Sequence, residues 1–262
     1  MKITLIGHMT VLLEIDGVNF LTDPWFGPCN LVEKILAPRL VKPSKTSDEL
    51  SGIDAMLVSH NHIDHFDAKA IELARRTCCT VIGSKGVAKR AVKCGLKNVV
   101  ALQECEMTEF RGIHINAVHA EHPLASDAIG LIVRGGRSVY FSGDTRLSQK
   151  TVNDLDRFTI DVALAQGACA WYPFAGKDGM DLPDLTHFAE LTSPVWTVPL
   201  HLDCIGKWLE HRGGVRISKD NPAQVNDALI KWKNMMSSKS LGAMLLGHGE
   251  EWEPYGKDTD AR

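Results

Sequence analysis

Residues 54–65 read Asp-Ala-Met-Leu-Val-Ser-His-Asn-His-Ile-Asp-His, and this stretch decides both the fold and the chemistry. Its apolar start is typical of a buried strand, and the polar residues that follow indicate that the strand ends in a loop. The next residues have helical spacing, with Asp67 placed as the N-cap. The metal-binding side chains therefore stand on a strand–loop–helix corner, and they are His60, His62, Asp64 and His65.

These side chains suit two metal ions. His60 and His62 are two residues apart, so in an extended segment they point the same way and can hold one ion together. Asp64 and His65 follow where the chain turns, and they can reach a second ion, which in two-metal hydrolytic sites is about 3.5–4 Å from the first. The alternative is a solvated polar loop before a helix, but one loop rarely collects three histidines and an aspartate without a cation.

Further ligands must come from other strand ends, because a six-residue loop cannot complete two coordination shells. Three later segments each place a His or an Asp after a β-rich run. They are residues 118–122 with His119 and His122, residues 142–145 with Asp144, and residues 199–201 with His201.

The order of these motifs resembles the metallo-β-lactamase superfamily: His-x-His-x-Asp-His, a later His, Gly-Asp, and a late His. Residues 3–14 and 20–24 are similar to the branch that includes ascorbate-6-phosphate lactonases and N-acylphosphatidylethanolamine-hydrolysing phospholipases. The resemblance covers nearly the whole chain. It implies an α/β (α+β) fold, the four-layer αββα sandwich, with residues 1–262 as one metallo-hydrolase domain. The mixture of hairpins and helices also favours two packed sheets with helices outside.

The resemblance implies a role for each candidate ligand. The first ion would be bound by His60, His62 and His119, the second by Asp64, His65 and His201, and Asp144 would bridge both. A metal-bound hydroxide would be the nucleophile, because zinc lowers the pKa of bound water from about 15.7 to about 7. Asp64 would orient this hydroxide or accept its proton. We expect two divalent ions per chain, zinc first, with manganese or iron as alternatives.

His122, three residues after His119, is an alternative candidate for the same ligand position. His119 ends the alternating run and matches the family position, so we expect it to be the ligand. His122 would then lie at the rim of the site.

Other residues are candidates for the surroundings of the metals. His8 follows a strand and would face the site, and His248, between two glycines, would donate a proton. Tyr172 and Lys177 would bind an anionic substrate that has an apolar part. Asp23 would accept a hydrogen bond from a ligand imidazole, as such sites usually need. The structural alternatives are a backbone-bonded histidine, a turn residue, an aromatic anchor beside a solvated lysine, and an Asx turn.

Composition excludes several classes of protein. With 44% hydrophobic and 23% charged residues, the chain is an ordinary globular protein. A net charge of −3 makes nucleic-acid binding unexpected, which argues against a nuclease. The N-terminus is too short and too soon polar for a signal peptide, and no apolar run approaches the ~20 residues that span a membrane. Seven cysteines, with an adjacent pair, do not look like a disulfide framework, so a cytoplasmic location is expected.

The periodicity also predicts individual elements. A hairpin with an Asp16-Gly17 turn is expected over residues 3–21. Helices are expected at 86–94, 152–158, 185–191 and 222–236, and a closing strand at 241–246.

The function that these observations favour is a dinuclear metal-dependent hydrolase acting on a small anionic ester, either a phosphodiester or a lactone. Neither a nucleic-acid partner nor a membrane span is expected, and the sequence is silent on oligomeric state. The alternatives are a metal-dependent nuclease and a noncatalytic binding protein on the same fold. The second is disfavoured because such proteins typically lose ligands, whereas this chain keeps all seven.

Overall fold

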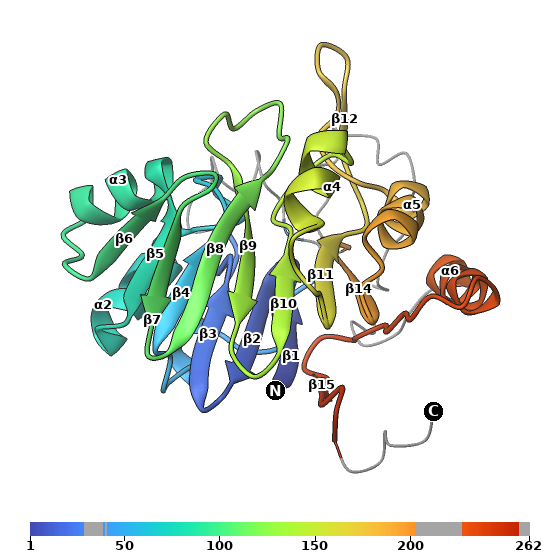
Figure 1. Ribbon diagram of the computed structural model, residues 1–262. Coiled ribbons are helices and arrows are strands. Elements are labelled where there is room, and N and C mark those ends of the chain that lie inside the picture. Colours follow the sequence, from blue (N-terminus) through green and yellow to red (C-terminus); the bar gives the residue numbers. More distant parts are fainter. Residues whose placement is uncertain (29–38, 40, 203–226, 257–262) are drawn as a thin grey trace.

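The computed structural model describes residues 1–28, 39, 41–202 and 227–256, and most of its strands form two mixed sheets packed face to face (Figure 1). The strands of the first sheet are β1 (Lys2–Gly7), β2 (Thr10–Ile15), β3 (Val18–Thr22), β4 (Ala55–Val58), β5 (Thr80–Ser84), β6 (Val99–Leu102) and β15 (Glu251–Trp252). They lie in the order β15-β1-β2-β3-β4-β5-β6. The pairs from β15 to β3 are antiparallel and those from β3 to β6 are parallel.

The second sheet is built in the same mixed manner. Its strands are β7 (Met107–Phe110), β8 (Ile113–His119), β9 (Ile129–Arg134), β10 (Ser138–Phe141), β11 (Val162–Gln166) and β14 (Trp196–Leu200). They lie in the order β14-β11-β10-β9-β8-β7, antiparallel from β7 to β10 and parallel from β10 to β14. A separate hairpin, β12 (Trp171–Tyr172) and β13 (Gly176–Lys177), projects from the molecule between β11 and the helix that follows (Figure 1).

Helices cover the outer face of each sheet. They are α2 (Ala68–Thr77), α3 (Lys85–Lys93), α4 (Gln149–Leu155), α5 (Leu182–Thr192) and α6 (Asp227–Ser238), with a short 3-10 helix η1 (Ser47–Glu49). The helices α2 and α3 pack on the first sheet, and α4, α5 and α6 on the second (Figure 1). The layers are therefore helix, sheet, sheet, helix, which confirms the predicted sandwich. Among the described helices, none is long and apolar enough to cross a membrane.

The strand β4 shows why its sequence is apolar throughout. Successive side chains of a strand point to opposite faces. Ala55 and Leu57 belong to the core between the sheets, whereas Met56 and Val58 belong to the core beneath α2. Burial of each larger side chain stabilises the fold by about 1.5–3 kcal/mol. A strand covered on both faces has no polar position, and its polar residues come only after it ends.

Most of the predicted elements are confirmed. The hairpin over residues 3–21 forms β1 to β3, and its turn has positive φ at Asp16 (50°) and Gly17 (79°). Asp67 is the N-cap of α2, where its carboxylate accepts the N–H of Ala70 at 2.7 Å. The predicted helix at 152–158 begins earlier, after the N-cap Ser148. The expected start of α6 at residues 221–222 lies outside the described residues.

The predicted strand at 241–246 is wrong. This segment makes a single parallel bridge, between Ala243 and Thr197 of β14. Thr197 donates to the carbonyl of Gly242 and accepts from Met244 through its backbone, both at 3.0 Å. The chain then leaves the second sheet, because β15 must pair with β1 of the first sheet.

The two sheets meet at one edge, where β1, β3 and β4 of the first sheet end close to β10 and β14 of the second. Two backbone hydrogen bonds, each 3.2 Å long, join them there: His201 N–H to the carbonyl of His8, and Ile129 N–H to that of Ser59. Residues that follow these strands, although far apart in the sequence, therefore converge.

Candidate metal centre

The first group of donors consists of His60, His62 and His122, whose ligand nitrogens lie within 4.8 Å of one another. His60 is fully buried, and its Nε2 has no hydrogen-bond partner among the described residues. The Nδ1 of His62 lies 3.3 Å from the Nε2 of His122. Each of these two rings is held from behind by a carbonyl, that of Leu124 on His62 Nε2 (3.3 Å) and that of Asp178 on His122 Nδ1 (3.0 Å).

Those carbonyls determine the tautomers of the two imidazoles. A carbonyl oxygen can only accept, so His62 Nε2 and His122 Nδ1 carry the protons in the neutral rings. The other two nitrogens then face each other as lone pairs at 3.3 Å. Two acceptors at this separation repel unless a cation lies between them. The first group therefore has the form of a metal site.

The structure places His119 elsewhere, which corrects the expectation that it joins this group. Its Nδ1 contacts Glu104 at 3.0 Å, and its backbone N–H donates to Asp154 at 2.9 Å. His119 is the last residue of β8 and is paired with Ile129 in the sheet, so the strand sets the direction of its side chain. The loop that follows carries His122 over the edge of the sheet.

A signal for this distinction is present in the sequence. His60 comes two residues after β4, Asp144 three after β10, and His201 one after β14. The converging donors thus lie beyond the last residue of the strand, where the chain is free to turn. His122, three residues after β8, fits that rule and His119 does not.

The second group of donors comprises His8, Asp64, His65 and His201, with ligand atoms again within 4.8 Å. The Oδ2 of Asp144 lies 3.3 Å from Nε2 of both His65 and His201. The His8 ring lies 3.9 Å from that of His201 between centroids, and its Nε2 is 3.8 Å from Asp64 Oδ2. His8 is thus inside the site, as expected from its position after β1.

Several polar atoms here are buried without a hydrogen-bond partner among the described residues: Nε2 of His65, both ring nitrogens of His201 and Oδ1 of Asp144. An unsatisfied buried polar atom costs about 1–3 kcal/mol, and more when the group is charged. Such atoms demand an explanation. Imidazole nitrogens and carboxylate oxygens are also the donors that divalent transition metals prefer. The residues present therefore fit a metal centre.

The electrostatics of the two groups differ. Burial alone would lower the pKa of His65, but neighbouring carboxylates, Asp144 first, outweigh burial and raise that pKa well above its usual value. Burial would raise the pKa of Asp144, yet His201 and His65 hold it well below its usual range. Burial, reinforced by His65, lowers the pKa of His60 well below its usual value. The second group attracts positive charge, and His60 keeps its lone pair available.

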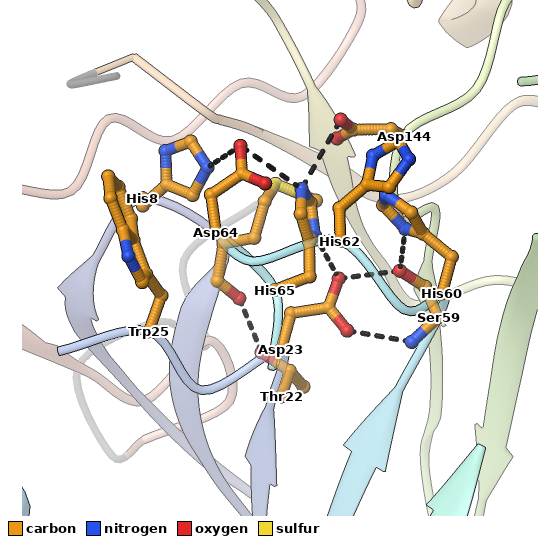
Figure 2. A network of polar contacts seen from close by, with 12 residues as sticks. His8, Thr22, Asp23, Trp25, Ser59, His60, His62, Asp64, His65 and Asp144 are labelled. Atoms are coloured by element: carbon orange, nitrogen blue, oxygen red, sulfur yellow. Dashed lines mark hydrogen bonds and ion pairs between the residues drawn. The ribbon is translucent and has the colours of Figure 1, made fainter. Parts of the chain in front are cut away.

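A hydrogen-bond network behind these donors orients them (Figure 2). The Oδ2 of Asp23 accepts the Nδ1–H of His65 at 2.7 Å, which confirms the expected contact between Asp23 and a ligand imidazole. The same carboxylate accepts the backbone N–H of Ser59 at 2.7 Å and its hydroxyl at 2.6 Å. The Ser59 hydroxyl in turn lies 2.9 Å from Nδ1 of His60. Outer contacts of this kind fix the ring orientation and tautomer of a metal ligand.

The residues expected to bind substrate have other contacts. The ammonium of Lys177 lies 2.5 Å from Asp181 and 2.8 Å from Asp184, so it is paired with two carboxylates at the start of α5. Burial would lower the pKa of Lys177, but these two carboxylates raise it. Tyr172 packs against Phe174 on the projecting hairpin, with ring centroids 5.7 Å apart.

His248, the expected proton donor, lies beside Gly7. Its Nδ1 contacts the carbonyl of Lys42 at 3.1 Å, so Nδ1 donates in this bond. A Cβ at Gly7 would come within 2.8 Å of the His248 ring. Within the described part of the chain, His248 belongs to neither donor group.

A two-sheet sandwich with clustered His and Asp donors at its strand ends defines a candidate metal centre, and the relatives of this chain identify the class as metal-dependent hydrolases. Residues 18–202 match the family described as the beta-lactamase superfamily domain. The UPF0173 metal-dependent hydrolase of Methanopyrus kandleri is 31% identical over 214 residues, which cover 77% of this chain and 84% of that protein. The chain belongs to the metallo-β-lactamase superfamily.

Solved structures show the same fold at lower identity. A possible metal-dependent hydrolase from Veillonella parvula has a TM-score of 0.76 at 21% identity, covering 96% of this chain and 98% of that one. The isothiocyanate hydrolase from Delia radicum gut bacteria has a TM-score of 0.75 at 19% identity, covering 97% and 98%. At these identities the likeness establishes the architecture.

Proposed function

We propose that this chain is a dinuclear metal hydrolase. The first ion is assigned to His60, His62 and His122, and the second to Asp64, His65 and His201. Asp144, whose Oδ2 lies 3.3 Å from His65 and from His201, would be shared by both ions. The observation that carries this proposal is the presence of two neighbouring donor groups, each with at least one buried ring nitrogen that has no hydrogen-bond partner among the described residues. The rings of His60 and His65, one from each group, lie 4.1 Å apart between centroids. Both sheets contribute ligands, which supports residues 1–262 acting as one domain.

Zinc is the first choice of ion. In a tetrahedral zinc site the Zn–N bonds are about 2.0–2.1 Å, so two ligand nitrogens are roughly 3.3–3.4 Å apart. The two facing nitrogens of His62 and His122 are 3.3 Å apart. Manganese and iron remain alternatives, because imidazole and carboxylate donors suit them as well.

Two divalent ions bound here would lower the pKa of a shared water and polarise a carbonyl or phosphoryl oxygen of the substrate. The protein's own part falls to Asp64, whose side chain is 20% exposed, whereas that of Asp144 is 5% exposed. Asp64 can meet both water and ligands, so we assign it to orienting the water and accepting its proton. His8 is 2% exposed and lies behind Asp64, so we assign it to holding that carboxylate rather than to binding substrate.

A small anionic ester is the proposed substrate, either a phosphodiester or a lactone. Two divalent ions would bring four positive charges to a site that contains the carboxylates of Asp23, Asp64 and Asp144 (Figure 2), and bound cations are the largest local charges in such a site. The ions themselves would therefore attract an anion, and Lys177 is not needed. These two ester classes are proposed because residues 3–14 and 20–24 resemble one branch of the superfamily.

Metal content and a substrate panel test this function together. Protein saturated with zinc and then desalted should retain two ions per chain by elemental analysis. It should hydrolyse a phosphodiester or a lactone in preference to a phosphomonoester or a thioester, and a chelator should abolish the activity reversibly. A value that stays near one ion would contradict the dinuclear site, and a preference for the thioester would contradict the substrate class.

A further inference from the structure

The hydroxyl of Ser59 lies between the carboxylate of Asp23 and the ring of His60. Its Oγ is 2.6 Å from Oδ2 of Asp23 and 2.9 Å from Nδ1 of His60 (Figure 2). All three residues are fully buried, so water cannot replace either contact. Ser59 follows β4 directly, one residue before the first histidine of the metal-binding loop.

The protons of this chain of contacts can be assigned. A serine hydroxyl has one proton, and an ionised carboxylate only accepts. At 2.6 Å from Asp23, the hydroxyl donates to that carboxylate. Its oxygen must then accept from His60, so Nδ1 of His60 carries the ring proton. The bare Nε2 of His60, which is buried and has no hydrogen-bond partner in the described structure, is left facing the first donor group.

The Asp23 carboxylate also contacts a histidine of the second group. Asp23 Oδ2 accepts the Nδ1–H of His65, whose Nε2 lies 3.3 Å from Asp144 on the other side of the ring. One aspartate oxygen therefore orients an imidazole of each group, directly for His65 and through Ser59 for His60. Asp23 is not itself a ligand in this arrangement, because its two oxygens already accept three hydrogen bonds.

We propose that Ser59 is a positioning residue that presents Nε2 of His60 to the first metal ion and joins the two donor groups through Asp23. The inference rests on the two-ion site proposed above. It predicts that loss of the hydroxyl weakens mainly the ion held with His60, whereas loss of the Asp23 charge weakens both ions.

The packing around Ser59 keeps the hydroxyl in place. Its carbonyl accepts Ile129 N–H from the second sheet at 3.2 Å, and its backbone N–H is held by Asp23. On the remaining side, a Cβ at Gly143 would lie 2.4 Å from Ser59 Cβ, and Gly143 has φ +55°. A serine locked on three sides has one orientation of its hydroxyl, which is what positioning a ligand requires.

Metal titration of Ser59→Ala tests the proposal, with Thr186→Val as the matched control. Thr186, on α5, is also buried, its hydroxyl donates to the carbonyl of Leu182 at 2.9 Å, and it accepts a ring N–H, that of Trp232, at 3.0 Å. Both substitutions therefore remove a buried hydroxyl with two hydrogen bonds, but only Ser59 touches a ligand. Zinc affinities are measured by competition with a chromophoric chelator, and the ion lost in His122→Ala identifies the first group.

The affinity of the first ion should fall about 10–100-fold in Ser59→Ala, as is typical for loss of an outer contact to a metal ligand. In Thr186→Val both affinities should stay within about twofold of the wild type. Asp23→Asn should weaken both ions, and adding Ser59→Ala to it should cost the first ion little more, because the two residues act in series. Equal affinities in Ser59→Ala and Thr186→Val would overturn the proposal.

A spectroscopic measurement on the unmodified protein tests the tautomer, even if Ser59→Ala does not fold. Long-range proton–nitrogen correlation spectra of histidine-labelled protein should show His60 protonated at Nδ1, with and without zinc. Protonation of His60 at Nε2 in the metal-free protein would refute the role of Ser59. Failure of the two-ion function is a different result, because the wild type itself would then bind fewer than two ions.

Discussion

Replacing His122 by alanine should remove one metal ion, whereas replacing His119 by alanine should leave both ions bound. His122→Ala deletes one of the nitrogens of the first group. His119→Ala deletes an imidazole that faces Glu104. The two variants make the same chemical change at positions three residues apart, so each is the control for the other.

The expected magnitudes follow from the contacts. In His122→Ala the buried carbonyl of Asp178 loses its donor, which costs about 1–3 kcal/mol of unfolding free energy with or without metal. A zinc ion present at 100 times its dissociation constant stabilises the fold by about 2.7 kcal/mol, and the first ion's contribution should vanish as well. In His119→Ala, Glu104 loses its contact with the imidazole but keeps Lys150 at 2.7 Å. The unfolding free energy should therefore fall by only about 0.2–1 kcal/mol, the usual worth of an exposed ion pair.

Urea unfolding in zinc and in chelator, together with elemental analysis, separates these effects. His122→Ala should retain one ion and show a smaller difference between the two unfolding curves than the wild type does. His119→Ala should retain two ions and the full difference. If His119→Ala loses an ion and His122→Ala does not, the assignment of the first group from the structure is refuted.

Two further predictions concern the glycine behind Ser59 and the buried thiol. Gly143→Ala should lower the affinity of the first ion, measured by chelator competition, because the added Cβ would lie 2.4 Å from Ser59 Cβ at a residue with φ +55°; unchanged affinity would contradict the tight packing. Burial, with nearby carboxylates, raises the pKa of Cys169 to about 12, so at pH 8 it is a thiol rather than the reactive thiolate. Mass spectrometry after brief alkylation at pH 8 should find label on the exposed Cys78 and Cys105 and not on Cys169; early labelling of Cys169 would contradict its burial.

The features that could be predicted from the sequence are local ones. The buried apolar strand β4, the Asp16-Gly17 turn and the N-cap Asp67 depend on neighbouring residues only, and the structure confirms each of them. The prediction of a strand at 241–246 was wrong because an apolar run does not indicate over how many residues it pairs with a neighbouring strand. The aspartate partners of Lys177 could not be predicted for a related reason, since they depend on how the hairpin meets α5.

The sequence by itself determined that this protein carries a metal centre on a strand–loop–helix corner, because the donors crowd into six residues after an apolar strand. Only the tertiary structure decided which donors lie close together and how they are oriented. His122 meets its carbonyl partner 56 residues away and His62 at a separation of 60, while Ser59 meets Asp23 at 36. Such contacts arise where strand ends of two sheets converge, and the direction of a side chain there is set by segments that local sequence patterns do not describe.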